Sequence, residues 1–190
     1  QSTRLSNLVS DLLTLSRLET GAGGLRFEAM DLRETVAESC RTQVHAAETK
    51  QVQLLSGLPD AAVTIDGDAE AMRELVDNLV SNAIKYTPSG GRVDVKLSTE
   101  NGSAVLEVAD TGIGIPPEEQ SRVFERFYRV DKARSRQLGG TGLGLSIVKH
   151  VALAHGGSVS LKSATGRGST FRVQLGLKPG NGSRREGPRA

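Results

Sequence analysis

The chain has 190 residues, of which 37% are apolar and 22 are glycine, with one cysteine and a formal net charge of +2. This composition is typical of one globular domain with a short appendage, and the single cysteine, Cys40, excludes an internal disulfide framework or a multi-cysteine metal site. The sequence has no apolar run near the roughly 18 residues that cross a bilayer, no signal-peptide pattern and no interleaved aromatic and basic residues, so we expect a soluble chain that contacts neither membrane nor nucleic acid.

The first predicted element is an amphipathic helix over residues 3–18. Its leucines alternate at spacings of three and four residues, which places them on one helix face: Leu5, Leu8, Leu12 and Leu15. This apolar face already runs at the first residues, so we expect the end of a longer helix in a helical stalk, with packing on its own domain as the alternative. The glycine-rich residues 21–24 predict a hinge after it.

Residues 25–86 predict short strands that alternate with two helices. A strand over 25–32 ends at Asp31, a residue type that caps the start of a helix, here one that runs through Ala47. Residues 52–67 predict strand and turn. The following helix, 68–86, has the clearest apolar face in the chain and ends in a Thr-Pro-Ser-Gly-Gly turn.

The rest of the chain predicts two hairpins and a helix. Two strands over 92–110 flank a Glu-Asn-Gly turn and predict the first hairpin. Prolines and acidic residues predict the start of a helix in 116–128. Another helix is predicted over 142–157, and residues 158–177 predict the last hairpin. This order predicts an α+β fold, a two-layer sandwich with helices on one face of a mixed, mainly antiparallel sheet. Residues 178–190, with four basic side chains against one acid, predict a disordered basic tail.

Polar side chains on the helix 68–86 form the first candidate site. Asn78 and Asn82 are four residues apart and share a helix face, and Lys85 follows three residues later. Asparagine is a middling helix former, so two of them beside an apolar stripe indicate a function. A carboxamide oxygen suits Mg²⁺ when phosphates supply the charge, and a lysine can meet a phosphate. The alternative is that both amides only bond nearby backbone.

The second motif is Asp110-Thr-Gly-Ile-Gly114, directly after a predicted strand. A carboxylate at a strand end beside glycines offers an acceptor and open backbone, which suits the exocyclic amine of a purine. The motif lacks the G-x-G-x-x-G spacing, so it does not predict a Rossmann dinucleotide site.

A glycine-rich loop forms the third motif, with four glycines in residues 139–144 before a predicted helix. Loop amides at a helix N-terminus bind anions, and no Lys-Ser/Thr pair follows, which excludes a P-loop. The preceding segment 123–129 holds three of the six aromatic residues, and the basic residues up to 137 have the composition of a mobile lid over phosphates.

Four segments in order, NLVSNAIKY, DTGIGIP, FERFYR and GGTGLGLSIV, resemble the N, G1, F and G2 boxes of the ATP-binding catalytic domain of sensor histidine kinases, in the gyrase, Hsp90, histidine kinase and MutL superfamily. The resemblance is specific over 68–177 and extends weakly back to residue 25. It implies a Bergerat-type ATP-binding sandwich over 25–177, with ATP and Mg²⁺ as cofactors.

Residue roles follow from the matching positions. The resemblance implies that Asn82 is the side-chain ligand of Mg²⁺ and that Asn78 supports it, while Asp110 accepts a hydrogen bond from the adenine amino group. The phosphates or the sugar edge would be met by Lys85 and Tyr86. The base would be lined by Gly112, Gly114 and Ile115, with Thr170 reaching it through water.

The remaining implied contacts are with the phosphates. Arg129 and Arg134 would touch the γ-phosphate region, so the implied catalytic set is Asn78, Lys85, Arg129 and Arg134. The loop that closes over the phosphates would consist of Gly140, Thr141, Gly142, Leu143 and Gly144.

The same resemblance gives residues 1–20 a place, as the end of the second helix of a dimerisation and phosphoacceptor hairpin. The phosphoacceptor His-Glu-x-x-x-Pro context is absent, and His45, His150 and His155 are expected to be structural or surface residues. We therefore expect this chain to bind nucleotide but not to autophosphorylate.

The leading hypothesis is a protein-histidine kinase domain that presents Mg-ATP for transfer to a hairpin histidine and then to a response-regulator aspartate. The implied partners are that hairpin, a receiver domain and a second copy in the whole protein, on the cytoplasmic side of a membrane-anchored bacterial sensor. One alternative is a clamp ATPase, whose relatives have a glutamate base where this chain has Asn78, an amide that cannot accept a proton from water. Another is a nucleotide-free dimerising scaffold, which the four intact motifs oppose.

Overall fold

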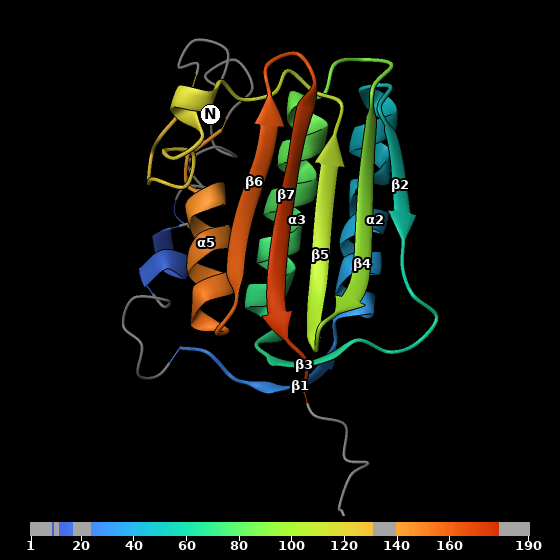
Figure 1. The fold of residues 1–190 in the computed structure, drawn as a ribbon, viewed down its shortest axis with the longest axis vertical. Coiled ribbons are helices and arrows are strands. Elements are labelled where there is room, and N and C mark those ends of the chain that lie inside the picture. The colour runs from blue at the N-terminus through green and yellow to red at the C-terminus, as the bar shows by residue number, and fades with distance from the viewer. Residues whose placement is uncertain (1–8, 10–11, 17–23, 131–139, 179–190) are drawn as a thin grey trace, which may run out of the picture.

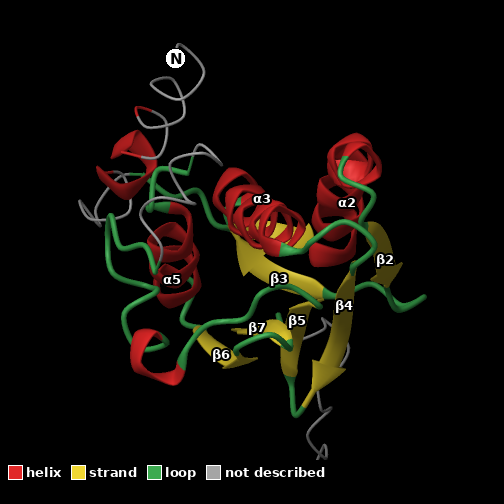
Figure 2. Ribbon diagram, turned by 90° about the horizontal axis from the view of Figure 1, so that it is seen from above, coloured by secondary structure: helices red, strands yellow, loops and turns green. Residues whose placement is uncertain are grey.

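The computed structural model describes residues 9, 12–16, 24–130 and 140–178. The helices α2 (Leu32–Thr49), α3 (Ala69–Tyr86) and α5 (Gly144–Ala154) lie side by side on one face of a five-stranded sheet (Figures 1 and 2). This arrangement confirms the predicted two-layer α+β sandwich. Within the described residues, no helix is both long and apolar enough to span a membrane.

The main sheet has the strand order β2-β4-β5-β7-β6. Its strands are β2 (Gln53–Gly57), β4 (Arg92–Glu100), β5 (Ser103–Asp110), β7 (Gly168–Gly176) and β6 (Ser158–Ala164). All neighbours pair antiparallel except β2 and β4, which pair parallel. Both predicted hairpins are present, and the sheet is mixed and mainly antiparallel as expected.

A second, two-stranded sheet lies at one end of the molecule, at the bottom of Figure 1. It pairs β1 (Glu28–Asp31) with β3 (Thr64–Gly67), antiparallel. The predicted strand and turn over 52–67 is therefore divided between two sheets, because β2 pairs with β4 of the main sheet while β3 turns back to β1.

Aspartates start the two long helices. Asp31 is the N-cap of α2, as predicted, and accepts a hydrogen bond from the Arg33 backbone N–H at 3.1 Å. Asp68 caps α3 in the same way through the Ala71 N–H at 2.9 Å. Because the first N–H groups of a helix have no partner within it, these carboxylates fix where each helix begins.

The core fills the space between the helices and the sheet. Helix α3 supplies its centre through Met72, Leu75 and Leu79, each 1% exposed or less. The N-terminal segment also contributes: residues 12–16 are helical and Leu15 is 3% exposed within the core cluster, whereas Leu13 on the same helix is 57% exposed. The predicted hinge at 21–24, except Gly24, and the tail after Lys178 lie outside the described residues.

The helix predicted to open in 116–128 does not form as an α-helix. Only a 3-10 turn, η1 (Pro117–Glu119), is present, followed by turns such as Glu125 N–H to Arg122 O at 2.8 Å. The backbone of Phe127 has a positive φ of 61° and donates to Gly142 O at 2.9 Å. The segment is wrapped onto the glycine-rich loop, and this tertiary contact replaces the helix that the local pattern favours.

Candidate functional site

Asp110 is the last residue of β5, and this end of β5 lies at the upper end of the sheet in Figure 1. Its Oδ1 accepts hydrogen bonds from the N–H of Gly112 at 2.8 Å and of Ser169 at 3.2 Å. Burial raises the pKa of Asp110, and these two backbone hydrogen bonds offset part of that rise. No ion pair or partner of Oδ2 is found among the described residues. The carboxylate is therefore fixed through one oxygen and offers the other as an acceptor.

Strand register decides which side chain lies beside Asp110. Asp110 pairs with Ser169 across β5 and β7, and Ser169 is 7% exposed, on the sheet face that carries the buried Phe171. Thr170 pairs with Ala109 and lies on the opposite face, where Arg172 bonds Glu107 at 2.8 Å. The sequence reasoning named Thr170, but Ser169 is the neighbour. The alternation of buried residues in 169–175 is the signal that would have identified it.

Glycines let the loop after β5 approach its neighbours closely. A Cβ added at Gly112 would lie 2.6 Å from Asp110 Oδ1 and 2.6 Å from Tyr86 O, at the end of α3. Gly114 has a φ of 67°, and its Cβ would overlap the carbonyl of Ala164. The next residue, Ile115, donates its N–H to Ser163 Oγ at 2.8 Å. The loop thus joins α3 to the β6–β7 turn.

The polar side chains of α3 lie against the glycine-rich loop that precedes α5. A Cβ at Gly144, the first residue of α5, would overlap Asn78 Oδ1 and lie 3.6 Å from Asn82 Nδ2. The Asn78 amide is oriented because its Nδ2 donates to Glu74 O at 2.9 Å, so it does bond nearby backbone. A Cβ at Gly140 would lie 2.6 Å from Lys85 Nζ. Because these glycines have no side chains, the amides of Asn78 and Asn82 and the ammonium group of Lys85 lie directly against the glycine-rich loop.

The glycine-rich loop is also shaped from within. Thr141 Oγ1 accepts from the Leu143 N–H at 3.2 Å, and the Leu143 side chain is fully buried in the core, so Leu143 can offer only backbone to a ligand. Gly142 has a φ of 80°, and its Cβ would lie 3.0 Å from the Phe127 backbone. These contacts hold the loop against the aromatic segment that precedes it.

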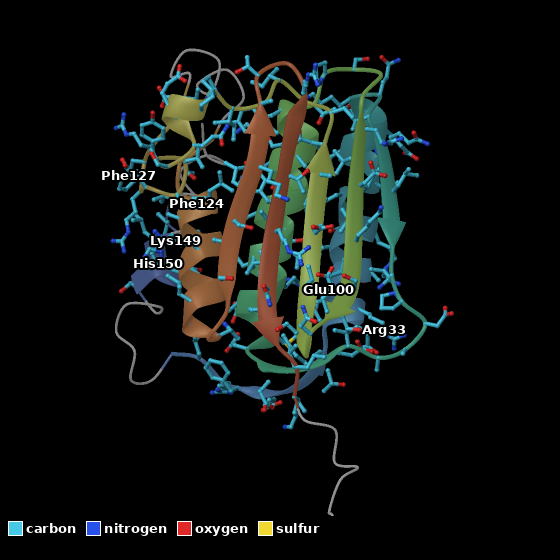
Figure 3. The ribbon with its side chains drawn as sticks, in the orientation of Figure 1. Arg33, Glu100, Phe124, Phe127, Lys149 and His150 are labelled. Carbon is cyan, nitrogen blue, oxygen red and sulfur yellow. The ribbon has the colours of Figure 1, made fainter. Side chains whose placement is uncertain are left out.

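The aromatic segment lies along α5. Figure 3 shows Phe124 and Phe127 on the same side of the molecule as Lys149 and His150. Phe124 packs edge-on against Phe171 with ring centroids 6.2 Å apart, as core, whereas Phe127 is 58% exposed. The Nε atom of Arg129 is buried without a hydrogen-bond partner in the described part of the chain. Arg134 lies outside the described residues.

His155 has a structural position, as expected. Its Nε2 accepts from the Asp68 N–H at 3.0 Å and its Nδ1 bonds Val151 O at 2.8 Å. Burial lowers the pKa of His155. The side chain is thus a neutral link between the end of α5 and the start of α3, and these two ends lie at the opposite end of the sandwich from the end of β5 (Figure 1).

The end of β5, the C-terminal half of α3, the β6–β7 turn and the start of α5 gather at one end of the sandwich (Figure 1). They combine an acceptor carboxylate, helix amides, a lysine and a glycine-rich loop at a helix N-terminus. This combination suits a purine base at one side and phosphates at the other. The fold and the site define a nucleotide-binding domain.

Comparisons with known proteins agree with that class. Residues 67–179 match the family described as histidine kinase-, DNA gyrase B-, and HSP90-like ATPase. The sensor histidine kinase RppB of Synechocystis sp. is 43% identical over 175 residues, which are 92% of this chain and 38% of the relative. The sensor-like histidine kinase SenX3 of Mycolicibacterium smegmatis is 42% identical over 175 residues, 92% of this chain and 45% of the relative.

A solved structure is also similar. The structure of full-length ShkA in complex with AMPPNP has a TM-score of 0.79 and 29% sequence identity, and the match covers 92% of this chain and 36% of that chain. The chain belongs to the family of histidine kinase-, gyrase B- and HSP90-like ATPases, and it contains the catalytic ATP-binding domain of the sensor histidine kinase type. It spans less than half the length of these curated relatives, at 38% and 45%.

Proposed function

We propose that this domain binds Mg-ATP and presents its γ-phosphoryl group to a histidine on a separate dimerisation hairpin, as a protein-histidine kinase. The observation that carries the proposal is the Asp110 carboxylate. Its Oδ1 is held by the N–H groups of Gly112 and Ser169, while the described residues give Oδ2 no partner. An oriented, unpaired acceptor at the end of a strand is suited to the amino group of adenine.

The phosphates are assigned to the other side of the site. Lys85 and the backbone N–H groups of the loop 140–144 would meet them, because both supply positive charge or donors at the start of α5. The Nε of Arg129 is buried and has no hydrogen-bond partner among the described residues, which supports a place for this residue beside an anionic group. Arg134 stays a prediction for the same role.

The amides of α3 are assigned to the metal. Asn82 would be the Mg²⁺ ligand and Asn78 its neighbour, since neutral oxygen donors suit Mg²⁺ that also binds phosphates. The overlap that a Cβ at Gly144 would make with Asn78 Oδ1 supports this assignment, because glycine keeps that oxygen uncovered from the loop side.

The chain's residues would act by position and charge. Bound ATP supplies the phosphoryl group, and transfer requires little covalent chemistry from the protein. Asp110 would orient the base, and Lys85 and Arg129 would balance charge at the phosphates. Asn78 cannot act as a general base, so the nucleophile would come from the acceptor histidine, which disfavours hydrolysis of the clamp-ATPase kind.

The partners follow from this role. We propose that residues 1–20 end the second helix of the hairpin, that 21–24 form the hinge and that 178–190 form a tail beyond the domain. In the whole protein the hairpin would dimerise and pass the phosphoryl group to a receiver domain, in the cytoplasm beneath a membrane anchor. The relatives are named as sensor histidine kinases, which supports this arrangement.

The test mixes this chain with a separate hairpin that carries the phosphoacceptor histidine, together with Mg²⁺ and ATP labelled at the γ-phosphate. We expect acid-labile, base-stable label on the hairpin, and none on this chain alone. The Asp110→Asn variant is the control, and it should transfer far less label. An unlabelled hairpin, together with rapid release of inorganic phosphate, would overturn the kinase assignment in favour of a hydrolase.

A further inference from the structure

Ser163, the penultimate residue of β6, is a junction of hydrogen bonds behind the site. Its Oγ accepts from the Ile115 N–H at 2.8 Å, donates to Gly168 O at 2.9 Å and lies 2.9 Å from Ser169 Oγ. Its carbonyl accepts from Gln120 Nε2 at 3.0 Å, and the same amide donates to Ile115 O at 2.9 Å. One side chain therefore joins the loop after β5 to the β6–β7 turn.

The hydrogen-bonding capacity of a hydroxyl fixes the direction of each of these bonds. A serine has one proton to donate and two lone pairs that accept. A carbonyl can only accept, so the Ser163 proton points to Gly168 O. The N–H of Ile115 uses one lone pair, and the second is left for Ser169. Ser169 must therefore be the donor in the contact between the two hydroxyls.

The consequence for Ser169 is that its only proton is engaged with Ser163. The described residues give Ser169 Oγ no further hydrogen-bond partner. Ser169 pairs with Asp110 in the β5–β7 register and donates its N–H to that carboxylate at 3.2 Å. The two side chains thus present acceptors, and no donor, at the place assigned to the edge of the base.

We propose that Ser163 is a positioning residue that sets base selectivity by holding the Ser169 proton away from the nucleotide. The inference rests on the proposed function, in which Asp110 receives the purine amine. A 6-amino group donates and fits a pair of acceptors, whereas a 6-oxo group accepts and is rejected by them. Without Ser163, the Ser169 hydroxyl can rotate and donate to a 6-oxo purine.

The test measures dissociation constants of Mg-ATP and of Mg-inosine triphosphate by competition with a fluorescent ATP analogue. The preference for ATP is the ratio of these two dissociation constants. In the Ser163→Ala variant this ratio should fall about tenfold, the factor that corresponds to the loss of one hydrogen bond. The Ser163→Thr variant keeps a hydroxyl and should retain the preference. Ser160→Ala, at an exposed serine of the same strand, should leave both constants unchanged.

A double substitution separates a positioning role from a structural one. In a Ser169→Ala background, Ser163→Ala should have no further effect on the ratio of the two constants, because its action passes through Ser169. Two results would overturn the inference. One is that Ser163→Ala weakens the binding of both nucleotides by the same factor. The other is that Ser163→Ala changes the ratio as much in the Ser169→Ala background as in the wild-type chain. If Ser163→Ala melts below the assay temperature, Ser163→Cys, a weak donor, makes the same comparison.

The Asp110→Asn variant in the same assay distinguishes two kinds of failure. Unchanged affinity for ATP in Asp110→Asn would contradict the base contact and with it the proposed function. A loss of affinity in Asp110→Asn, combined with an unchanged preference in Ser163→Ala, would remove only the role given to Ser163.

Discussion

Among single residues, Asp110 shows how the proposed base contact would cost stability. Burial raises the pKa of this carboxyl, so the folded state keeps its proton to higher pH than the unfolded state does. Stability therefore falls as pH rises from the unfolded-state pKa through the folded-state pKa. A carboxyl kept in such a position fits the proposed role in ligand binding better than a role in folding.

The Asp110→Asn substitution should separate these two effects. The amide oxygen can still accept from Gly112 and Ser169, while the buried charge is removed, so the melting temperature at pH 7 should rise. Affinity for Mg-ATP should fall by roughly ten- to a hundredfold, the range for a hydrogen bond to a charged group. Calorimetric melting and nucleotide titration check both. A lower melting temperature would mean that the carboxylate is a structural anchor.

Gly144 gives a second test at a single position, on the phosphate side. In Gly144→Ala the new methyl group would overlap Asn78 Oδ1, so the amide must move, and we expect Mg-ATP to bind about tenfold more weakly. The free energy of unfolding should change less than the free energy of Mg-ATP binding, because alanine favours the helix that begins at residue 144. Gly176→Ala is the matched control, since a Cβ there meets nothing within 4 Å. Equal affinity in the two variants would contradict the role of the Asn78 oxygen.

Between elements, side chains at helix ends hold the layers in register. Lys50, the C-cap of α2, donates from Nζ to Ile84 O at 2.9 Å and to Lys85 O, which are carbonyls of the last turn of α3. His155 at the end of α5 accepts the N–H of Asp68 at the start of α3. Because helix ends carry unpaired backbone groups, such bonds fix α3 against both neighbours and orient its polar face.

The His155 link should make folding stability depend on pH. Burial lowers the pKa of His155 below the ordinary value of about 6.5, so the unfolded state binds the proton more readily. The stabilisation is complete above the unfolded value and is lost as pH falls through the folded value. His155→Gln should flatten the fall in stability as pH drops below about 6.5, measured by urea unfolding at several pH values. His45→Gln, at an exposed histidine, should keep the slope, and a retained slope in His155→Gln would assign it to other groups.

Local patterns predicted the elements that local forces determine. Helix α3 and the hairpin β4–β5 were predicted from an apolar stripe and an Asn-Gly turn. The parallel pairing of β2 with β4 and the wrapped segment before the glycine-rich loop depend on contacts far apart in the sequence. For the same reason the faces of Thr170 and Ser169 could not be assigned from the motif: motif matching gives the position, and only the strand register gives the face.

Across the whole molecule, the site exists because distant segments meet. Asn78, Asp110, Gly144 and Ser169 come from four elements: helix packing brings Gly144 to Asn78, and strand pairing brings Ser169 to Asp110. Each motif alone has a plain structural explanation, and the Asn78 amide does bond its own helix. Their convergence carries the functional assignment, and the family match over residues 67–179 includes all four.

The N-terminal helix decides where the folded domain begins. Leu15 is 3% exposed within the core cluster, while Leu13 is 57% exposed. Leu15→Ala should therefore lower the free energy of unfolding by about 2–4 kcal/mol, and Leu13→Ala by less than about 0.5 kcal/mol. Denaturant unfolding of the two variants decides between a helix that is part of the core and a stalk that only precedes it. Equal, small effects would place the start of the folded unit after the glycine-rich residues 21–24.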